Sequence, residues 1–252
     1  MKTWSELYNE IMVVIRSMRA DILFFRGHGN VSWKLKPNIS RYVYKNEEQL
    51  SILENMAFFD YKTKSGALMK ENCSSWDIAF SMQHHGLPTR LLDWSENFSV
   101  ALYFALKGTI KTDSDCCVWI LNPFNLNKET VGEDSLFHPE DLELSYEQYF
   151  IFGHDKRKRY HYEDQVVAIS PLRHNPRLFN QHAGFTLHFN LEFELEGNNG
   201  FLKKIIIPKH LHNDAWEFLK LAGISEYSLF PDLDGLARDL TMRHYIGLDI
   251  SN

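Results

Sequence analysis

The chain has 252 residues, of which 44% are hydrophobic and 24% charged, so an ordinary globular core is expected and long disordered stretches are excluded. A net charge of −6 excludes a general nucleic-acid coat protein but leaves room for a local basic groove. Three cysteines exclude a disulfide framework, and neither cysteines nor histidines have zinc-ligand spacing, so we expect no metal site.

Targeting signals and linkers are absent from the sequence. The amino terminus lacks the basic start and apolar run of a signal peptide, and no apolar stretch reaches membrane-spanning length. We therefore expect a cytoplasmic protein without a membrane partner. Without repeats or linkers, residues 1–252 are expected to form one domain, with a helical amino-terminal part over about 1–85 and a polar excursion over about 125–160.

The first half of the chain alternates helical and strand patterns. Apolar residues at helical spacing predict a helix over 5–18 with Ser5 as its cap, and an apolar run over 22–25 predicts a buried strand that ends at Arg26. Further helices are expected over 47–68 and 75–85. A strand over 89–94 then leads to a helix that Ser95 caps and Gly108 ends.

The second half is richer in strands. They are expected over 116–121, 166–169, 185–189 and 202–207, and Asn198-Asn199-Gly200 predicts a hairpin between the last two. Helices over 213–222 and 233–242 close the chain. Strands distributed among helices indicate an α+β fold with a mixed or antiparallel sheet flanked by helices.

The densest polar segment runs from Gln83 to Ser95. It holds two imidazoles, a guanidinium and a carboxylate within a stretch that Gly86 and Pro88 shape, which is typical of a binding or catalytic site. The structural alternative is a buried ion pair between Arg90 and Asp93.

Arg26 offers the fork of donors that suits diphosphate or carboxylate recognition, and Gly27 and Gly29 would let a ligand approach the backbone. The basic run Lys156 to Arg159, next to aromatic residues, suits a phosphate chain, with a solvated loop as its alternative. Asp232 and Asp234 fit a helix start better than a metal site.

Taken together, these motifs resemble the FRG domain, a bacterial and phage family. The resemblance rests on Phe25-Arg26-Gly27, on the segment Gln83 to Ser95, on Val100 to Ala105, on Arg177 to Phe185 and on Leu229 to Ala237. It spans roughly Leu23 to Leu240.

A weaker resemblance, to ADP-ribosyltransferases, implies an activity. In those enzymes a strand-end arginine, a serine-containing strand, a Val-Ala-x-x-Phe-Ala-like helix and a late strand with Glu follow in order. Here Arg26, Asp93-Trp94-Ser95, Val100 to Ala105 and Gln181 keep that order, with Gln181 where an acid is usual. The resemblance implies an ADP-ribosyltransferase-like fold and transfer of ADP-ribose from NAD to a macromolecule such as RNA, DNA or protein. Such proteins act as toxins or in phage defence beside an antitoxin or regulatory protein.

The expected site follows from that chemistry. Gln181, Asp93 and Arg26 are the expected catalytic residues, and Glu163 or Asp232 are alternative sources of negative charge. Arg26 and Arg90 would hold phosphates, and Trp94 or Tyr103 would stack on nicotinamide. The expected cofactor contacts are Arg26, Gly27, His28, Gln83, His84, Arg90, Trp94, Ser95 and Tyr103.

Two other functions stay open. A nucleotide-sensing domain would use the same groups without turnover, and the replacement of the usual Glu by Gln181 favours it. A metal-dependent nuclease would instead require His84, His85, Asp93 and Asp232 to converge.

Overall fold

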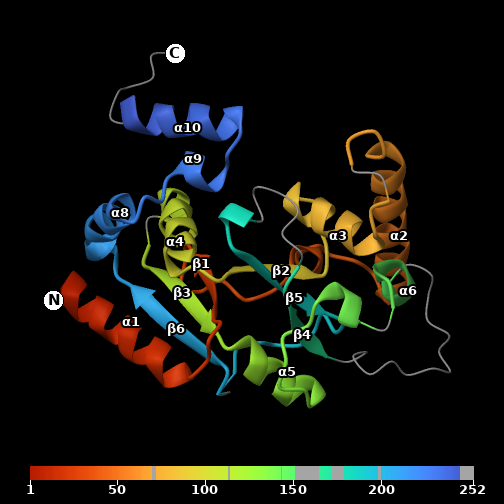
Figure 1. Ribbon diagram of the computed structural model, residues 1–252, viewed down its shortest axis with the longest axis horizontal. Helices are drawn as coiled ribbons and strands as arrows, with labels where there is room; N and C mark the ends of the chain where they lie inside the picture. The colour runs from red at the N-terminus through yellow and green to blue at the C-terminus, as the bar shows by residue number, and fades with distance from the viewer. Residues whose placement is uncertain are drawn as a thin grey trace.

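The computed structural model describes residues 1–69, 72–112, 114–142, 144–150, 165–171, 179–197 and 200–244. Six strands form one sheet in the order β4-β5-β2-β1-β3-β6, and every neighbouring pair is antiparallel (Figure 1). The fold is α+β, as the sequence predicts, and its sheet is antiparallel rather than mixed. The strands are β1 (Phe24–His28), β2 (Leu91–Ser95), β3 (Cys116–Leu121), β4 (Val166–Ile169), β5 (Ala183–His188) and β6 (Leu202–Ile207).

The sheet consists of two three-stranded halves that meet at one residue pair. Strands β4, β5 and β2 are in continuous register, as are β1, β3 and β6. Between the halves, β1 pairs with β2 only where Phe25 lies opposite Ser95. The next pairs in that register would be Arg26 with Trp94 and Gly27 with Asp93, but there the strands have separated. The sheet is therefore split in its middle.

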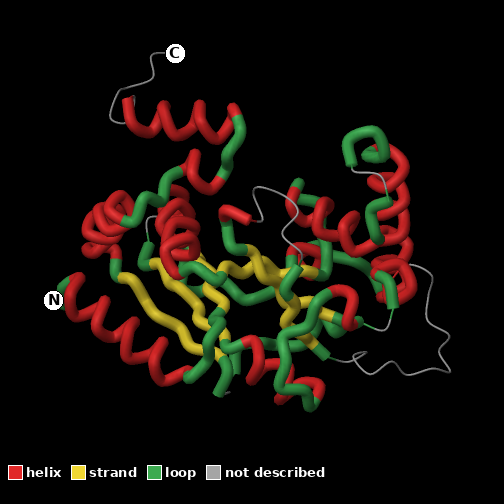
Figure 2. The backbone as a smooth tube through the Cα atoms, in the orientation of Figure 1, coloured by secondary structure: helices red, strands yellow, loops and turns green. Residues whose placement is uncertain are grey.

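Helices cover one face of the sheet in two separate groups (Figures 1 and 2). Over the β1-β3-β6 half, α1 (Trp4–Met18), α4 (Phe98–Thr112) and α8 (His212–Leu221) enclose one apolar core. Over the other half, α2 (Glu47–Lys64), α3 (Ser75–His84) and α6 (Tyr146–Phe150) enclose a second core that is rich in aromatic rings. The split in the sheet therefore lies between two independently packed cores.

Other elements cover the opposite face of the sheet. A third core there includes Trp94 and Trp119 and is covered by α5 (Pro123–Val131) and the loop that contains Leu195. The short helices are η1 (Asn38–Arg41), η2 (Pro139–Asp141), η3 (Lys209–Leu211) and α9 (Glu226–Leu229), and α10 (Leu233–His244) ends the described chain. No helix in these described ranges is both long and apolar enough to cross a membrane.

The predicted hairpin between the last two strands is wrong. β5 pairs with β2 and β4, whereas β6 pairs with β3 at the far edge of the sheet, so a connection rather than a tight turn separates them. The turn residues Asn198 and Asn199 lie outside the described residues. Local turn chemistry predicted adjacency, but the strand pairing depends on contacts that are distant in sequence.

Two predicted helix boundaries are also wrong. Ser95 ends β2, and the side chain of Asn97 accepts the N–H of Ser99 (2.8 Å) at the start of α4. Thr3, not Ser5, caps α1 and forms a capping box with Glu6. The polar excursion over 125–160 also contains helices α5 and α6 in its described part.

Gly27 in β1 and Gly29 just after it serve helix packing. A Cβ at Gly27 would lie 1.9 Å from the carbonyl oxygen of Ala101 in α4, and one at Gly29 would lie 2.5 Å from Cα of Gly108. Gly108 therefore does not end α4, which continues to Thr112, but lets the helix approach β1 closely. The space that we expected a ligand to use beside these two glycines is filled by α4.

Candidate functional site

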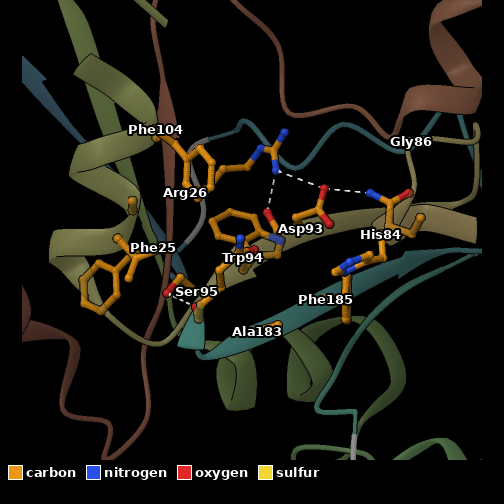
Figure 3. A pocket seen from close by; sticks show the side chains of 15 residues that line it. Phe25, Arg26, His84, Gly86, Asp93, Trp94, Ser95, Phe104, Ala183 and Phe185 are labelled. Atoms are coloured by element: carbon orange, nitrogen blue, oxygen red, sulfur yellow. Dashed lines mark hydrogen bonds and ion pairs between the residues drawn. The ribbon is translucent and has the colours of Figure 1, made fainter. Parts of the chain in front are cut away.

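A pocket of about 410 Å³ opens where the two halves of the sheet separate. Its walls come from α3 on one side and α4 on the other, its floor from β1, β2 and β5 (Figure 3). Most of the predicted site residues line it together, although they come from separate parts of the sequence. The lining residues are Phe25, Arg26, Gly27, Gln83, His84, Gly86, Asp93, Trp94, Ser95, Val100, Ala101, Phe104, Gln181, Ala183 and Phe185.

Arg26 bridges the split in the sheet. Its Nη1 donates to the backbone carbonyl of Asp93 (2.6 Å) and lies 3.7 Å from the Asp93 carboxylate. The side chain therefore occupies the place of the ladder hydrogen bonds that β1 and β2 do not make. Its Nε donates to Nε2 of His28 (3.2 Å), which fixes the plane of the guanidinium. Burial lowers the pKa of Arg26, and Asp93 opposes that shift.

The Asp93 carboxylate is held from a second side by Gln83. Gln83 Nε2 donates to Asp93 Oδ2 (2.6 Å), and Gln83 Oε1 accepts the Thr89 hydroxyl (2.6 Å), which fixes the orientation of the amide. Thr89 in turn accepts the N–H of Leu91 (3.1 Å). This series of hydrogen bonds begins at the buried backbone of Leu91 and ends at the Asp93 carboxylate, whose side chain is 54% exposed. The carboxylate therefore presents a fixed negative charge to the pocket.

Aromatic residues line the pocket, although Trp94 is only 4% exposed and its ring lies in the third core, on the opposite face of the sheet. Trp94 is held by a hydrogen bond from its Nε1 to Thr186 Oγ1 (3.1 Å), and Phe185 stacks on Phe80 with ring centroids 5.2 Å apart. Phe104 reaches the pocket from α4, and Figure 3 shows its ring beside Arg26. These rings are fixed by packing before any ligand binds.

Ser95 and Gln181 close the pocket at the end of β2. The Ser95 hydroxyl donates to the backbone carbonyl of Gln181 (2.6 Å), and it accepts the N–H of Asn97 (3.0 Å). The Gln181 amide donates to the carbonyl of Leu229 (3.2 Å) at the end of α9. Gln181 thus lines the pocket, as predicted, and its side chain also anchors the carboxy-terminal helices.

His84 points into the pocket from the end of α3, in line with its predicted position (Figure 3). The neighbouring His85 faces away and lines a second cavity of about 570 Å³ between α2 and α3. The two imidazoles of the motif therefore border different cavities, although their rings meet edge to face with centroids 4.7 Å apart.

Arg90 lies outside the pocket. Its guanidinium forms a two-pronged ion pair with Glu54 (2.9 to 3.1 Å), donates to the carbonyl of Phe189 (3.2 Å) and lies 4.7 Å from the ring centroid of Phe150. The hydroxyl of Tyr146 also donates to Glu54 (2.9 Å). Arg90 is thus in a buried ion pair, but with Glu54 rather than with Asp93.

Tyr103 is also outside the pocket, in the core beneath α8. Its hydroxyl donates to Glu226, which also accepts Lys107 (2.6 Å) and Arg238 (2.8 Å). Burial, together with Glu226, raises the pKa of Tyr103. The face of α4 that points to the pocket carries Val100 and, one turn later, Phe104. The ring that lines the pocket is therefore that of Phe104, not that of its predicted neighbour Tyr103.

His28 lies behind Arg26 and contacts the pocket only through it. Burial first, and then the charge of Arg26, lower the pKa of His28 to about 3. His188, beneath Thr186, has its pKa lowered to about 3 by burial and by the charges of Arg26 and Arg90. Both imidazoles are therefore neutral at physiological pH.

The other predicted acids are not in the pocket. Asp232 accepts the N–H of Gly235 (2.6 Å) and caps α10, as its position after Pro231 predicts. Glu163, the basic run Lys156 to Arg159, and Arg177 lie outside the described residues. Within the described ranges, no three His, Cys, Asp or Glu side chains gather in a way that could hold a metal ion.

Sequence reasoning missed Phe104, Phe185 and Thr89. Phe104 could have been found from its spacing of four from Val100 on the same helical face. Phe185 is two residues from Ala183 in one strand and so shares its face, but only the pairing of β5 with β2 places both in the pocket.

The comparisons with known proteins agree with part of this description. The model of the FRG domain matches residues 21–114, which include Arg26, Gln83, His84 and Asp93. No curated protein and no solved structure matches the chain. We expected the similarity to extend to Leu240, but it is found only up to residue 114. This part holds both strands at the split and the helices on either side of it. The chain therefore contains an FRG domain over residues 21–114.

Proposed function

We propose that the pocket binds NAD and that the protein transfers ADP-ribose from NAD to a macromolecule. The observation that carries the proposal is the junction of Arg26 and Asp93, a diphosphate-binding group and a fixed carboxylate, across the split in the sheet. The order of these elements, with α4 following β2, also keeps the motif order of ADP-ribosyltransferases, whose fold we propose for this chain.

The size and donors of the pocket suit a nucleotide. Its volume of about 410 Å³ lies within the roughly 300–1,000 Å³ of small-molecule sites. In the described part of the chain, Nη2 of Arg26 has no hydrogen-bond partner, so it can donate to a diphosphate oxygen while Nη1 and Nε stay bound to the protein. The guanidinium of Arg26 is therefore oriented before a ligand binds.

The aromatic surfaces suit the nicotinamide. In NAD this ring carries a positive charge, and a cationic ring is attracted to the face of an aromatic side chain. Phe104 lines the pocket from α4, and Figure 3 shows its ring beside Arg26. A nicotinamide bound there would place its bond to ribose near the Asp93 carboxylate.

The reaction requires stabilisation of a cation. The bond between C1′ of ribose and the nicotinamide nitrogen breaks, its electron pair leaves with nicotinamide, and the neutral base departs. The positive charge that develops on the ribose is stabilised by Asp93, which Gln83 and Arg26 hold in place before the reaction begins. A nucleophile of the acceptor then bonds to C1′ and loses its proton to water.

A nucleotide sensor is the second candidate, and one observation favours it. Gln181 carries no charge, and its amide is already bound to the carbonyl of Leu229. Asp93 is also the only acid among the described residues that line the pocket. If Asp93 does not promote bond breaking, the same pocket binds the nucleotide without turnover.

Incubation with NAD labelled in its ADP-ribose part tests the proposal. Purified protein is mixed with total RNA, single-stranded DNA or cell lysate, and label transfer and nicotinamide release are measured for wild type, Arg26→Ala and Gln181→Ala. Arg16→Ala, which removes an exposed arginine from α1, is the matched control. We expect transfer by wild type and the control, and loss of transfer in Arg26→Ala.

Thermal unfolding with and without NAD separates the two candidates. A rise in the unfolding temperature without nicotinamide release identifies a sensor. If NAD neither stabilises the wild-type protein nor is cleaved to release nicotinamide, both candidate functions are contradicted.

A further inference from the structure

The segment between β1 and α2 has a charge opposite to that of the whole chain. From Asn30 to Asn46 it contains Lys34, Lys36, Arg41 and Lys45 and no acidic residue, in a chain whose net charge is −6. Among the residues that the structure describes, only Lys34 of these four has a nearby carboxylate, that of Glu196 at 3.8 Å. Within the described residues, no acid lies at ion-pair distance from the other three, so their charges are available to an anion.

Exposed aromatic rings accompany these charges. Tyr42 is 63% exposed and Trp33 is 44% exposed, in a protein whose large aromatic residues are mostly buried. Tyr42 directly follows Arg41 in the sequence, and both residues are exposed. Alternating cations and exposed rings are what single-stranded nucleic acids bind, because phosphates meet the cations and bases stack on the rings.

The same segment contacts two residues, His28 and Thr89, that are hydrogen-bonded to pocket-lining side chains. At one end Trp33 packs against His28, with ring centroids 6.2 Å apart, two residues after Arg26. At the other end the N–H of Ile39 donates to the carbonyl of Thr89 (3.4 Å), the residue whose hydroxyl holds Gln83. The positive charge of Arg41 contributes to the lowered pKa of Arg26, as expected for neighbouring cations. The segment therefore runs beside the opening where the proposed reaction takes place.

From this arrangement we infer that the β1–α2 segment binds a single-stranded nucleic acid and presents it to the pocket as the acceptor of ADP-ribose. The role of the nucleic acid as acceptor of ADP-ribose rests on the proposed function, but the binding of nucleic acid does not. An acidic protein surface would meet the cations equally well, but it would make no use of an exposed Tyr42 beside Arg41. The aromatic residues thus favour nucleic acid.

Fluorescence anisotropy tests the binding without NAD. The probes are labelled single-stranded DNA and RNA of about twelve nucleotides, within the roughly 4–16 nucleotides that single-strand binding sites cover. The variants are Arg41→Gln, Lys36→Gln and Tyr42→Ala, and the matched control is Lys220→Gln, which removes an exposed lysine at the end of α8. Because Arg41, Tyr42 and Lys220 are exposed and Lys36 is partly exposed, the unfolding temperature should stay within a few degrees of wild type.

We expect wild-type protein to bind at least one probe, with an affinity that falls as salt rises. Each charge variant should weaken binding by several-fold and reduce the salt dependence, and Tyr42→Ala should weaken it about tenfold. The control should leave binding unchanged. No binding by wild type, or equal binding by all variants, would overturn the inference.

A competitor distinguishes the macromolecules. If polyglutamate displaces the probe as well as unlabelled oligonucleotide does and Tyr42→Ala has no effect, the segment is an interface for acidic protein, and the inference is wrong. Oligonucleotide binding without nicotinamide release would uphold the nucleic-acid site and refute the transferase. If the protein binds no oligonucleotide but transfers label to protein, the transferase is upheld and the nucleic-acid site is refuted.

Discussion

Arg90 and Asp93 lie three residues apart in one motif, and the structure gives them opposite surroundings. Arg90 is buried against Glu54 and Tyr146 between the second core and the sheet, whereas Asp93 opens into the pocket with a side chain that is 54% exposed. The buried pair holds helix α2 to the sheet. The half-exposed pair keeps a charge within reach of a ligand. Composition alone does not separate a structural ion pair from a candidate site, but burial and the remaining hydrogen-bond capacity do.

The largest expected effect concerns the buried pair. Glu54→Gln would leave the Arg90 guanidinium without a countercharge in the core, which costs about 3–5 kcal/mol of unfolding free energy. Chemical denaturation measures it. The matched control is the double variant Glu54→Leu with Arg90→Met, which removes both charges and should recover much of the loss. If Glu54→Gln unfolds like wild type, the pair does not secure α2.

The next effect concerns the pocket pair. Asp93→Asn should lower the rate of nicotinamide release by about 100-fold, because removal of one preorganised electrostatic contact typically costs that much. Its unfolding free energy should change by no more than about 0.5 kcal/mol, since the side chain is half-exposed. Single-turnover kinetics and denaturation on the same preparation check both. A stability loss as large as that of Glu54→Gln would remove the contrast between the two regions.

A third prediction uses the neutral histidines behind the pocket. The pKa values of His28 and His188 are lowered to about 3 from an ordinary 6.5, so the unfolded chain binds more protons than the folded one between these values. Stability is therefore full above about pH 6.5 and falls as the pH drops toward 3, by about 1.4 kcal/mol per pH unit for each histidine.

His188→Leu sharpens that test. Within the described residues Nδ1 of His188 has no hydrogen-bond partner, so a leucine loses only the contact of Nε2 with the Thr186 hydroxyl (3.2 Å), and this contribution to the slope should be about halved. His210→Gln, at an exposed position, is the control. An unchanged slope in His188→Leu would mean that this imidazole is not held neutral.

The smallest expected effect concerns the support of Asp93. Gln83→Leu removes one hydrogen bond to the carboxylate but leaves Arg26, so nicotinamide release should fall by about fivefold, as for the loss of about 1 kcal/mol. The NAD-dependent rise in unfolding temperature should remain. A loss as severe as that of Asp93→Asn would show that Gln83 itself contacts the reacting groups.

The sequence by itself determined the local elements and many of the pocket residues. Periodicity placed the six longest described helices and the six described strands to within a few residues, because a buried face imposes its own spacing, whereas the shorter helices α5, α6 and α9 were not predicted. The motif from Gln83 to Ser95, together with Arg26, identified the site. Clusters of charged side chains cost folding free energy unless the charges are paired, so an unusual cluster indicates either ion pairs or a functional site. The α+β class followed from the alternation of these elements.

Only the tertiary structure decided which charges are partners and which strands are neighbours. It separated β5 from β6, paired Arg90 with Glu54 from α2, and turned Phe104 rather than Tyr103 toward the pocket. Each of these depends on residues far apart in sequence, whose packing no local pattern encodes. The split between β1 and β2 is of the same kind: Phe25 and Ser95 pair, Gly27 and Asp93 do not, and the guanidinium of Arg26 spans the gap that results.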